Sequence, residues 1–320
     1  MTSSATGEVP PSGSHGGDAG AVAQALGIDV SRMLDLSQSL NPVVPDVLPV
    51  LRRHLGSLRR YPDPRPATAA LARAMGVDQS RLLLTNGGAE AIALVAAHLG
   101  GRVVEPEFSL HPRGGGPRWR SNPHNPTGLL AGADEQADVW DEAFYPLATG
   151  QWTRGDDAVV VGSLTKLFGL PGLRVGYVLV PAHRVSVVDA CRERQPEWSV
   201  NALAACALPE LLELAELASW AASVRRLRDR LVSVLHDHGL RPRPSDANWV
   251  LVDALGLRDR LAPHGVLVRD CASFGMPGTM RIAVPPSAGL ERLADALAWT
   301  GPGPGREHRE HVVPMRRGQP

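Results

Sequence analysis

The sequence has 320 residues but only one lysine, Lys166, although lysine and arginine together number 33. All the other basic side chains are therefore arginine. An arginine stays protonated at physiological pH, whereas a lysine amine can lose its proton and condense with a carbonyl. Either the composition is biased against lysine and Lys166 is an ordinary surface residue, or Lys166 occupies a position whose chemistry requires an amine. The residues around it favour the second interpretation, a Schiff-base lysine.

Cysteine is also scarce, and neither sign of charge is in excess. The three cysteines, Cys191, Cys206 and Cys271, lack the close spacing of metal ligands. This argues against a zinc site or a disulfide scaffold and favours a reducing cytoplasm. The formal net charge of +0 gives no reason to expect a nucleic-acid partner or an acidic membrane surface.

Long apolar runs are missing as well. No stretch reaches the roughly 18 apolar residues that a membrane-spanning helix needs, and the first residues lack the basic start and apolar core of a signal peptide. Residues 1–20 and 301–320 are rich in small residues and proline, so we expect both to be disordered tails. We expect a cytoplasmic protein without a bound metal ion.

Lys166 lies in the segment SLTKLFGLPGLRVGY, residues 163–177. The apolar run DAVVVGSL, typical of a buried parallel strand, leads into it, and a turn with glycine and proline follows. Ser163 and Arg174 flank the lysine, and a hydroxyl and a guanidinium can together bind an anion. An amine beside an anion site suggests a phosphorylated aldehyde as the ligand.

Three further motifs carry chemistry. RLLLTNGGAEAIALVAAHLGG (81–101) predicts a strand, a glycine turn and a helix whose first N–H groups can bind a phosphate. SNPHNPTG (121–128) presents the amide of Asn125 on a loop fixed by two prolines. ADVWDEAFYPL (137–147) predicts a buried strand that ends in acidic residues, the first of which is Asp141.

Together these motifs closely resemble those of the class I and II aminotransferases, the fold-type I family of pyridoxal 5'-phosphate (PLP) enzymes. The lysine segment is most similar to the branch that contains histidinol-phosphate aminotransferase and threonine-phosphate decarboxylase. The resemblance covers about residues 30–300 and implies an α/β fold, with a large, mostly parallel sheet domain flanked by helices and a small C-terminal α/β domain. It also implies PLP as cofactor and a homodimer.

The parts of this fold are expected to follow one another along the chain. Residues 21–60 are expected to contribute to the small domain, 61–200 to form the PLP-binding large domain, 201–240 the connecting helices and 241–300 the small C-terminal domain. In the last part, NWVLVDA, VLVRD and MRIAV predict strands.

By position in the matching motifs, the resemblance gives roles to individual residues. Lys166 is the catalytic lysine, and Asp141, the second catalytic residue, faces the pyridine nitrogen so that the ring acts as an electron sink. The other cofactor-binding residues are the phosphate ligands Gly88, Ala89, Ser163 and Arg174, then Asn125 at the phenolate oxygen, His111 stacked on the ring, and Tyr61, which reaches the phosphate of a neighbouring subunit. The expected substrate-binding residues are Arg281, Arg269 and Asn41.

Two departures from the family pattern bear on activity. Between Phe108 and the motif that begins at Ser121, where the family has several tens of residues, this chain has only SLHPRGGGPRWR. The loss of one βα unit and a piece of the sheet is therefore expected. Phe144 stands where many transaminating relatives carry a tyrosine, and in this it resembles the threonine-phosphate decarboxylase branch.

The substrate is expected to be a small amino acid, free or phosphorylated. We expect a decarboxylase of L-threonine O-3-phosphate of the kind found in cobalamin biosynthesis. An aminotransferase of the histidinol-phosphate type shares the cofactor and the homodimer and stays an alternative. The second alternative is a PLP-binding protein that has lost its activity because the large domain is shortened.

Overall fold

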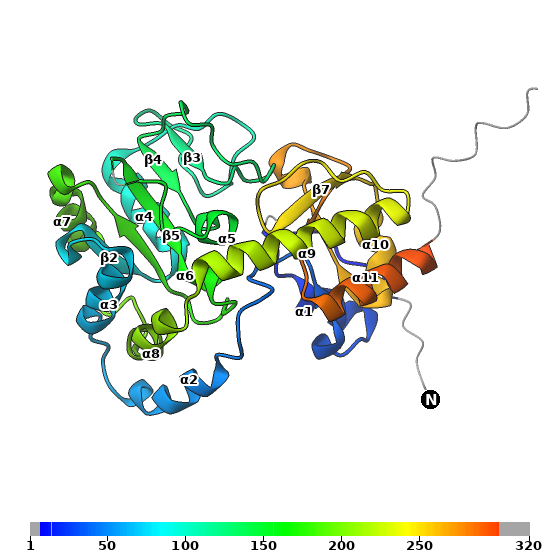
Figure 1. The fold of residues 1–320 in the computed structure, drawn as a ribbon, viewed down its shortest axis with the longest axis horizontal. Helices are drawn as coiled ribbons and strands as arrows, with labels where there is room; N and C mark the ends of the chain where they lie inside the picture. The colour runs from blue at the N-terminus through cyan, green and yellow to red at the C-terminus, as the bar shows by residue number, and fades with distance from the viewer. Residues whose placement is uncertain (1–6, 14, 156, 301–320) are drawn as a thin grey trace, which may run out of the picture.

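The computed structural model describes residues 7–300 except residues 14 and 156. This part of the chain forms a large and a small domain, and the long helix α9 (Leu217–Asp237) runs from one to the other (Figure 1). α9 packs against α5 (Tyr145–Thr149) of the large domain and α11 (Ser287–Thr300) of the small domain. Its buried residues recur every three or four positions and form one apolar stripe.

The large domain is built on a five-stranded sheet. Its strands lie in the order β2 (Leu82–Thr85), β6 (Gly176–Leu179), β5 (Val159–Ser163), β4 (Val139–Asp141) and β3 (Trp119–Ser121). β3, β4 and β5 are parallel, and β6 runs antiparallel to both its neighbours, β5 and β2. β2, β3, β4 and β5 therefore run in one direction and only β6 is reversed, which confirms the mostly parallel sheet predicted from the sequence.

Helices cover both faces of this sheet, which explains why its central strands are apolar throughout. Val159 and Val161 pack toward α4 and α7, whereas Val160 packs toward α3 and α8 on the opposite face. Successive strand residues face opposite sides, so a strand covered on both faces needs a continuous apolar run. The covering helices are α4 (Gly87–Leu99), α7 (Val185–Arg194), α3 (Arg65–Met75), α8 (Ala202–Glu213) and, outside α8, α2 (Leu48–His54).

The small domain contains two small sheets. β7 (Trp249–Asp253), β10 (Thr279–Ala283) and β9 (Arg269–Asp270) form an antiparallel sheet, while β1 (Leu34–Asp35) pairs in parallel with β8 (Val266–Leu267). The segment VLVRD, predicted as one strand, is thus divided at Val268 between the two sheets. The helices of this domain are α1 (Ala19–Leu26), α10 (Leu257–Leu261) and α11.

Short helices connect these elements. They are α6 (Leu164–Leu167) and the 3-10 helices η1 (Val30–Arg32), η2 (Leu55–Arg59), η3 (Gln79–Arg81), η4 (Ala182–Arg184), η5 (Ala262–His264) and η6 (Ala272–Phe274). Of these, α6 carries Lys166 directly after β5.

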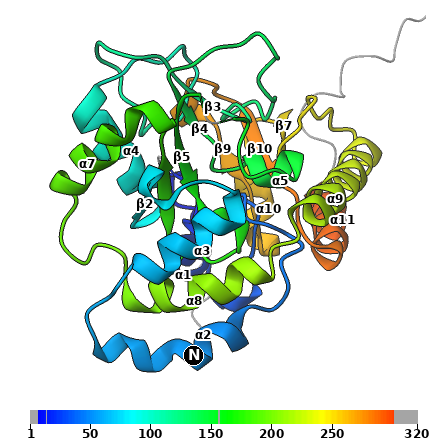
Figure 2. The same ribbon diagram turned by 60° about the vertical axis from the view of Figure 1, so that its left-hand side comes forward.

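The amino-terminal part differs from the expectation in two respects. Residues up to 20 were expected within a disordered tail, but Asp18 forms a 2.7 Å ion pair with Arg258 of α10. A buried guanidinium needs such a carboxylate, because an unpaired buried charge is costly. The segment 21–60 serves both domains, since β1 joins the small domain whereas α2 lies beside α8 of the large domain (Figures 1 and 2). Residues 1–6 and 301–320 lie outside the described chain.

A compact loop connects Phe108 to β3. This is the connection that was expected to be shorter than in the family. Arg113 organises this loop, because its guanidinium donates hydrogen bonds to the carbonyl oxygens of Glu107 (3.0 Å) and His111 (2.8 Å). It also forms an ion pair with the carboxylate of Glu105 at 2.5 Å. After the loop the chain enters β3 at the buried Trp119, and β3 pairs with β4. The loop therefore preserves the pairing that brings the Asn125 motif beside Asp141.

Candidate active site

A cavity of about 560 Å³ lies where the sheet of the large domain meets the small domain. Asp141, the last residue of β4, and Ser163, the last of β5, both line it. The carboxyl ends of parallel strands are the usual place for ligand sites in α/β proteins. The predicted site residues that line the cavity are Gly88, Ala89, Asn125, Asp141, Ser163, Lys166, Arg174, Arg269 and Arg281.

Lys166 presents its amine to this cavity from α6. Its Nζ lies 6.0 Å from the centre of the Phe144 ring and has no hydrogen-bond or ion-pair partner among the residues that the structure describes. Burial lowers the pKa of Lys166 to about 8, with further lowering by Arg281 and the other cavity arginines, while Asp141 acts in the opposite direction. An amine with this pKa is suited to condense with a carbonyl near neutral pH.

The amino terminus of α4 forms one wall of the cavity through Gly88 and Ala89. Free N–H groups at the start of a helix and the positive end of its dipole favour an anion there. Close packing requires glycine at two positions here, one at the start of α4 and one on the neighbouring strand β6. Gly87 has a φ of 76°, and a Cβ on Gly176 of β6 would lie 2.6 Å from the backbone nitrogen of Gly88.

Ser163 and Arg174 face the same end of the cavity. The Arg174 guanidinium lies so close to Gly87 that a Cβ on this glycine would be 2.5 Å from Nη2. Arg174 itself has a φ of 54°, a backbone conformation that costs a non-glycine residue free energy of order 1 kcal/mol or more. Two N–H groups, a hydroxyl and a guanidinium thus converge on one place, which is the donor set that a phosphate requires.

Asp141 is held by two hydrogen bonds that leave it at the cavity wall. Its Oδ1 accepts from the backbone N–H of Ala143 at 3.0 Å, and its Oδ2 lies 2.9 Å from Nε2 of His111. His111 is buried and does not line the cavity. The stacking role predicted for His111 is therefore corrected: its ring supports Asp141 from behind. Phe108, three residues earlier, is the aromatic side chain of this loop that lines the cavity.

Asn125 and Arg281 meet across the two domains. Nη1 of Arg281 donates a 2.8 Å hydrogen bond to Oδ1 of Asn125, and the guanidinium lies 5.0 Å from the centre of the Trp249 ring. Burial, and then the positive charge of Arg269, lower the pKa of Arg281 to about 9. No carboxylate of the described chain forms an ion pair with Arg281. A buried guanidinium without an anionic partner is prepared to bind an anionic ligand.

Arg269 and the amino-terminal segment close the remaining side of the cavity. Arg269 lies over the Phe274 ring at 4.9 Å, and burial lowers its pKa. Residues 15–17 also line the cavity, held by a 2.9 Å hydrogen bond from the N–H of Gly17 to Oγ of Ser37. We did not predict these residues, because the Gly- and Ser-rich sequence around His15 is typical of a tail.

Like His111, two further predicted residues do not line the cavity. The side chain of Asn41 donates to the carbonyl oxygen of Leu167 at 2.9 Å and accepts from the N–H of Val43 at 3.0 Å. Its predicted contact with substrate is therefore corrected to a contact that fixes the lysine segment. Tyr61 is 78% exposed and stacks on Trp198, with 4.5 Å between ring centres.

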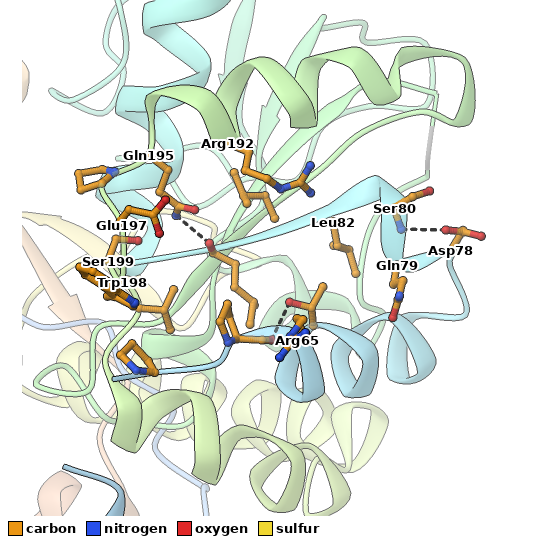
Figure 3. Close-up of a pocket in the computed structure, with 17 residues that line it drawn as sticks. Arg65, Asp78, Gln79, Ser80, Leu82, Arg192, Gln195, Glu197, Trp198 and Ser199 are labelled. Atoms are coloured by element: carbon orange, nitrogen blue, oxygen red, sulfur yellow. Dashed lines mark hydrogen bonds between the residues drawn. The ribbon is translucent and has the colours of Figure 1, made fainter. Parts of the chain in front are cut away.

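A second cavity, of about 830 Å³, opens on the outer side of the large domain near Tyr61 (Figure 3). It lies along the edge strand β2 and the connection between α7 and α8, and Figure 3 shows Arg65, Asp78, Glu197 and Trp198 around it. None of the predicted site residues lines it. Although it is larger, it lacks the amine and the convergent anion-binding groups of the first cavity, which we therefore assign as the active site.

Two further structural observations concern other classes of site. Within residues 7–300, excluding the two omitted positions, no group of three or more His, Cys, Asp or Glu side chains is placed to hold a metal ion. The described part of the chain also contains no helix that is long and apolar enough to cross a membrane.

Comparison with known proteins identifies relatives over most of the chain. A profile of the family "Aminotransferase class I and II" matches residues 119–297. Threonine-phosphate decarboxylase of Salmonella typhimurium is 32% identical over 351 positions, covering 88% of this chain and 95% of that protein. Histidinol-phosphate aminotransferase 2 of Pseudomonas fluorescens is 29% identical over 343 positions, covering 87% and 91% respectively. This alignment is longer than the 320 residues of the chain, so the chain carries gaps relative to that protein, as a shortened connection requires.

Solved structures confirm the fold. Histidinol-phosphate aminotransferase of Sinorhizobium meliloti, in complex with pyridoxal-5'-phosphate, superimposes with a TM-score of 0.74 at 19% identity, covering 88% of this chain and 94% of that one. L-threonine-O-3-phosphate decarboxylase of Porphyromonas gingivalis gives a TM-score of 0.69 at 21% identity, covering 82% and 97%. The arrangement of two domains around the cavity is thus shared with enzymes of this fold.

Proposed function

The chain belongs to the class I and II aminotransferase family, and on that premise we propose that it is a PLP-dependent decarboxylase of L-threonine O-3-phosphate. PLP is the cofactor. The observation that carries the proposal is the charge of one cavity: Lys166 and three arginines line it, and Asp141 is the one carboxylate among its lining residues. Such an excess of positive charge suits a cofactor phosphate together with a substrate that has both a carboxylate and a phosphate.

The residues present fit PLP. The start of α4 with Ser163 and Arg174 would hold its phosphate, Asp141 its ring nitrogen, Asn125 its phenolate oxygen and Lys166 its aldehyde carbon. The fit rests on this donor set: a carboxylate, an amine and an anion-binding group of N–H, hydroxyl and guanidinium donors all line one cavity. Arg281 then stays available for an anionic group of a substrate, and Arg269 lines the same cavity.

Each of these residues has a definite task. When bound, PLP draws electrons away from one bond at the α carbon of an amino acid. The carboxylate of Asp141, oriented by His111, stabilises a proton on the ring nitrogen. The amine of Lys166 accepts or donates a proton at the α carbon, a task for which a pKa of about 8 leaves both protonation states populated near neutral pH.

The choice of reaction depends on how the arginines hold the substrate. If Arg281 held the substrate carboxylate, the Cα–H bond would be the one exposed to reaction, and transamination would follow. If the arginines held the substrate phosphate instead, the carboxylate would be left free, and CO₂ would be lost. Phe144 favours the second outcome, since it stands where many transaminating relatives have a tyrosine hydroxyl and it lines the cavity beside Lys166.

An aminotransferase of the histidinol-phosphate type is the second candidate. It is supported by the relatives of that name, among them the Pseudomonas fluorescens protein at 29% identity. Both candidates use the same cofactor and the same cavity, so they differ in the products that they form rather than in the residues that they need.

The visible spectrum of the purified protein with added PLP, compared with Lys166→Ala, tests the proposal first. A yellow band that depends on Lys166, followed by CO₂ and an amino-alcohol phosphate from L-threonine O-3-phosphate, is the expected result. A keto product with a pyridoxamine spectrum contradicts decarboxylation and supports the aminotransferase. If PLP gives no lysine-dependent band, or gives the band but no product from a panel of amino acids, the chain has lost its activity.

A further inference from the structure

Glu107 is a fully buried carboxylate in the loop that leads to β3. Its Oε1 accepts a 2.5 Å hydrogen bond from Oγ of Ser121, and its Oε2 accepts one of 2.9 Å from the N–H of the same residue. Within the described part of the chain, its charged partners are two histidines, His111 at 3.7 Å and His124 at 3.9 Å. Arg120 also acts on this carboxylate electrostatically, but its ion pair is with Glu135 at 2.6 Å. A buried carboxylate that forms no ion pair with an arginine or lysine requires a positive charge nearby.

His111 lies between this carboxylate and Asp141. Its Nε2 is 2.9 Å from Oδ2 of Asp141, and its Nδ1 is 3.7 Å from Oε1 of Glu107. The imidazole is completely buried, and Nδ1 has no hydrogen-bond partner in the described chain. Both neighbours are acceptors, so only a ring with a proton on each nitrogen presents an N–H to both of them. The doubly protonated ring also balances one of the two buried negative charges.

A second path leads from Glu107 to the loop of Asn125, which also lines the cavity. Oγ of Ser121 donates to Glu107 and accepts a 2.7 Å hydrogen bond from the backbone N–H of Asn125. One buried carboxylate thus supports both Asp141, through His111, and Asn125, through Ser121. These two residues are the ones that would contact the ring nitrogen and the phenolate oxygen of the cofactor.

We propose that Glu107 is a positioning residue that holds His111 as an imidazolium against Asp141 and, through Ser121, fixes the loop of Asn125. The consequence for the reaction rests on the proposed function. A cation behind Asp141 holds this carboxylate in the orientation that it needs to retain a proton on the ring nitrogen.

The other charged groups near His111 do not replace Glu107. Glu105 acts on the same region, but its side chain is 57% exposed and is already paired with Arg113. Arg113 touches His111 only through the backbone, donating to its carbonyl oxygen at 2.8 Å. Glu107 is therefore the buried negative charge that faces Nδ1.

The protonation state of His111 is the direct test, and it needs neither cofactor nor turnover. Nitrogen-15 NMR of histidine-labelled protein, with His111 assigned by its loss in His111→Gln, reports whether each ring nitrogen carries a proton. We expect both to be protonated at neutral pH in the wild-type protein. A singly protonated ring there overturns the proposal, whatever the variants do.

Glu107→Gln then separates charge from packing, because glutamine retains an oxygen that can accept from Ser121. We expect a singly protonated His111, an altered pH profile of the Lys166-dependent absorbance band, and a kcat lowered by about ten-fold or more with little change in KM. That size is typical when a carboxylate partner of a functional histidine is removed from a metal site. In a His111→Gln background the same substitution should have little further effect on kcat.

Glu210→Gln is the matched control, since it removes a partly buried carboxylate that pairs with another histidine, His54, and does not contact His111. It should leave the His111 spectrum and the pH profile unchanged. If Glu107→Gln behaves like this control, Glu107 is only a packing residue and the proposal fails. If His111 is doubly protonated as expected but no substrate is turned over, the role proposed for Glu107 stands and the proposed function fails.

Discussion

Arg281 of the small domain donates a 2.8 Å hydrogen bond to Asn125 of the large domain, so the two domains meet directly at the cavity. The bond satisfies one N–H of a buried guanidinium with a neutral partner and leaves its charge without a carboxylate in the described chain. An anionic substrate group that binds there therefore pairs with a charge that is already desolvated. This makes Arg281 the strongest anion-binding group that the cavity offers to a substrate.

Replacing Arg281 by lysine should raise KM for the amino-acid substrate by about ten- to a hundred-fold, because a bidentate contact is lost and a charged hydrogen bond contributes about 1.5–3 kcal/mol. Steady-state kinetics with saturating PLP measures the effect. Arg226→Lys, an exposed arginine that bonds only to Ser223, is the control and should have a wild-type KM. Equal KM values for the two variants would place the substrate anion elsewhere.

The lowered pKa of Lys166 predicts how its reactivity depends on pH. Because it is the only lysine, reductive trapping with an aldehyde followed by peptide mapping follows this amine alone. The labelling rate should rise with a midpoint near pH 8 in the folded protein without cofactor, and near the ordinary 10.5 in denaturant. A midpoint of about 10 in both states would contradict the buried position of the amine.

The same shift has a consequence for stability. The folded-state pKa of Lys166 lies below its ordinary value, so between about pH 8 and 10.5 the unfolded chain binds more protons than the folded one. The contribution of this group to the free energy of unfolding therefore rises as pH rises through that window. Lys166→Met should remove this part of the pH dependence and make the cofactor-free protein more stable at neutral pH. Denaturant unfolding at several pH values measures both effects.

The parts of the site that the sequence predicts are those that local structure determines. Asp141, Ser163 and Lys166 each stand at or just after the end of an apolar strand, and parallel strands bring such ends to one edge. The glycines before α4 likewise mark a helix start by themselves. The main anion site was therefore predictable from residues that are continuous in the chain, whereas the fold class came from the family resemblance that these motifs carry.

The parts that sequence reasoning missed depend on contacts between distant segments. His15 reaches the cavity because Asp18 is paired with Arg258, 240 residues away. His111 supports Asp141 because Arg113 sets the shape of an irregular loop, which has no periodicity to reveal the direction of a side chain. Asn41 was misassigned for the same reason, since its partners belong to the lysine segment.

Gly176→Ala should weaken PLP binding without changing any side chain of the cavity. The new Cβ would lie 2.6 Å from the backbone nitrogen of Gly88 and would push the start of α4 away from Ser163. Overpacking of this kind costs about 1–3 kcal/mol, and about 1.4 kcal/mol is ten-fold in a binding constant. We therefore expect a PLP dissociation constant raised about five- to a hundred-fold, measured by spectroscopic titration. Gly172→Ala, which has open space around its Cβ, should bind like the wild type.

Tyr61 gives the test of a shared active site. Its side chain is 78% exposed and stacks on Trp198 beside the outer cavity, outside the lysine cavity of its own chain. We propose that in a homodimer Tyr61 contacts the cofactor phosphate in the site of the other subunit. Tyr61→Ala and Lys166→Ala should then each impair activity when alone. A mixture of the two variants, after exchange of subunits, should recover activity, because a hybrid dimer contains one site with both an intact lysine and an intact tyrosine. No recovery from subunits that demonstrably exchange would mean that Tyr61 serves its own chain or only packs against Trp198.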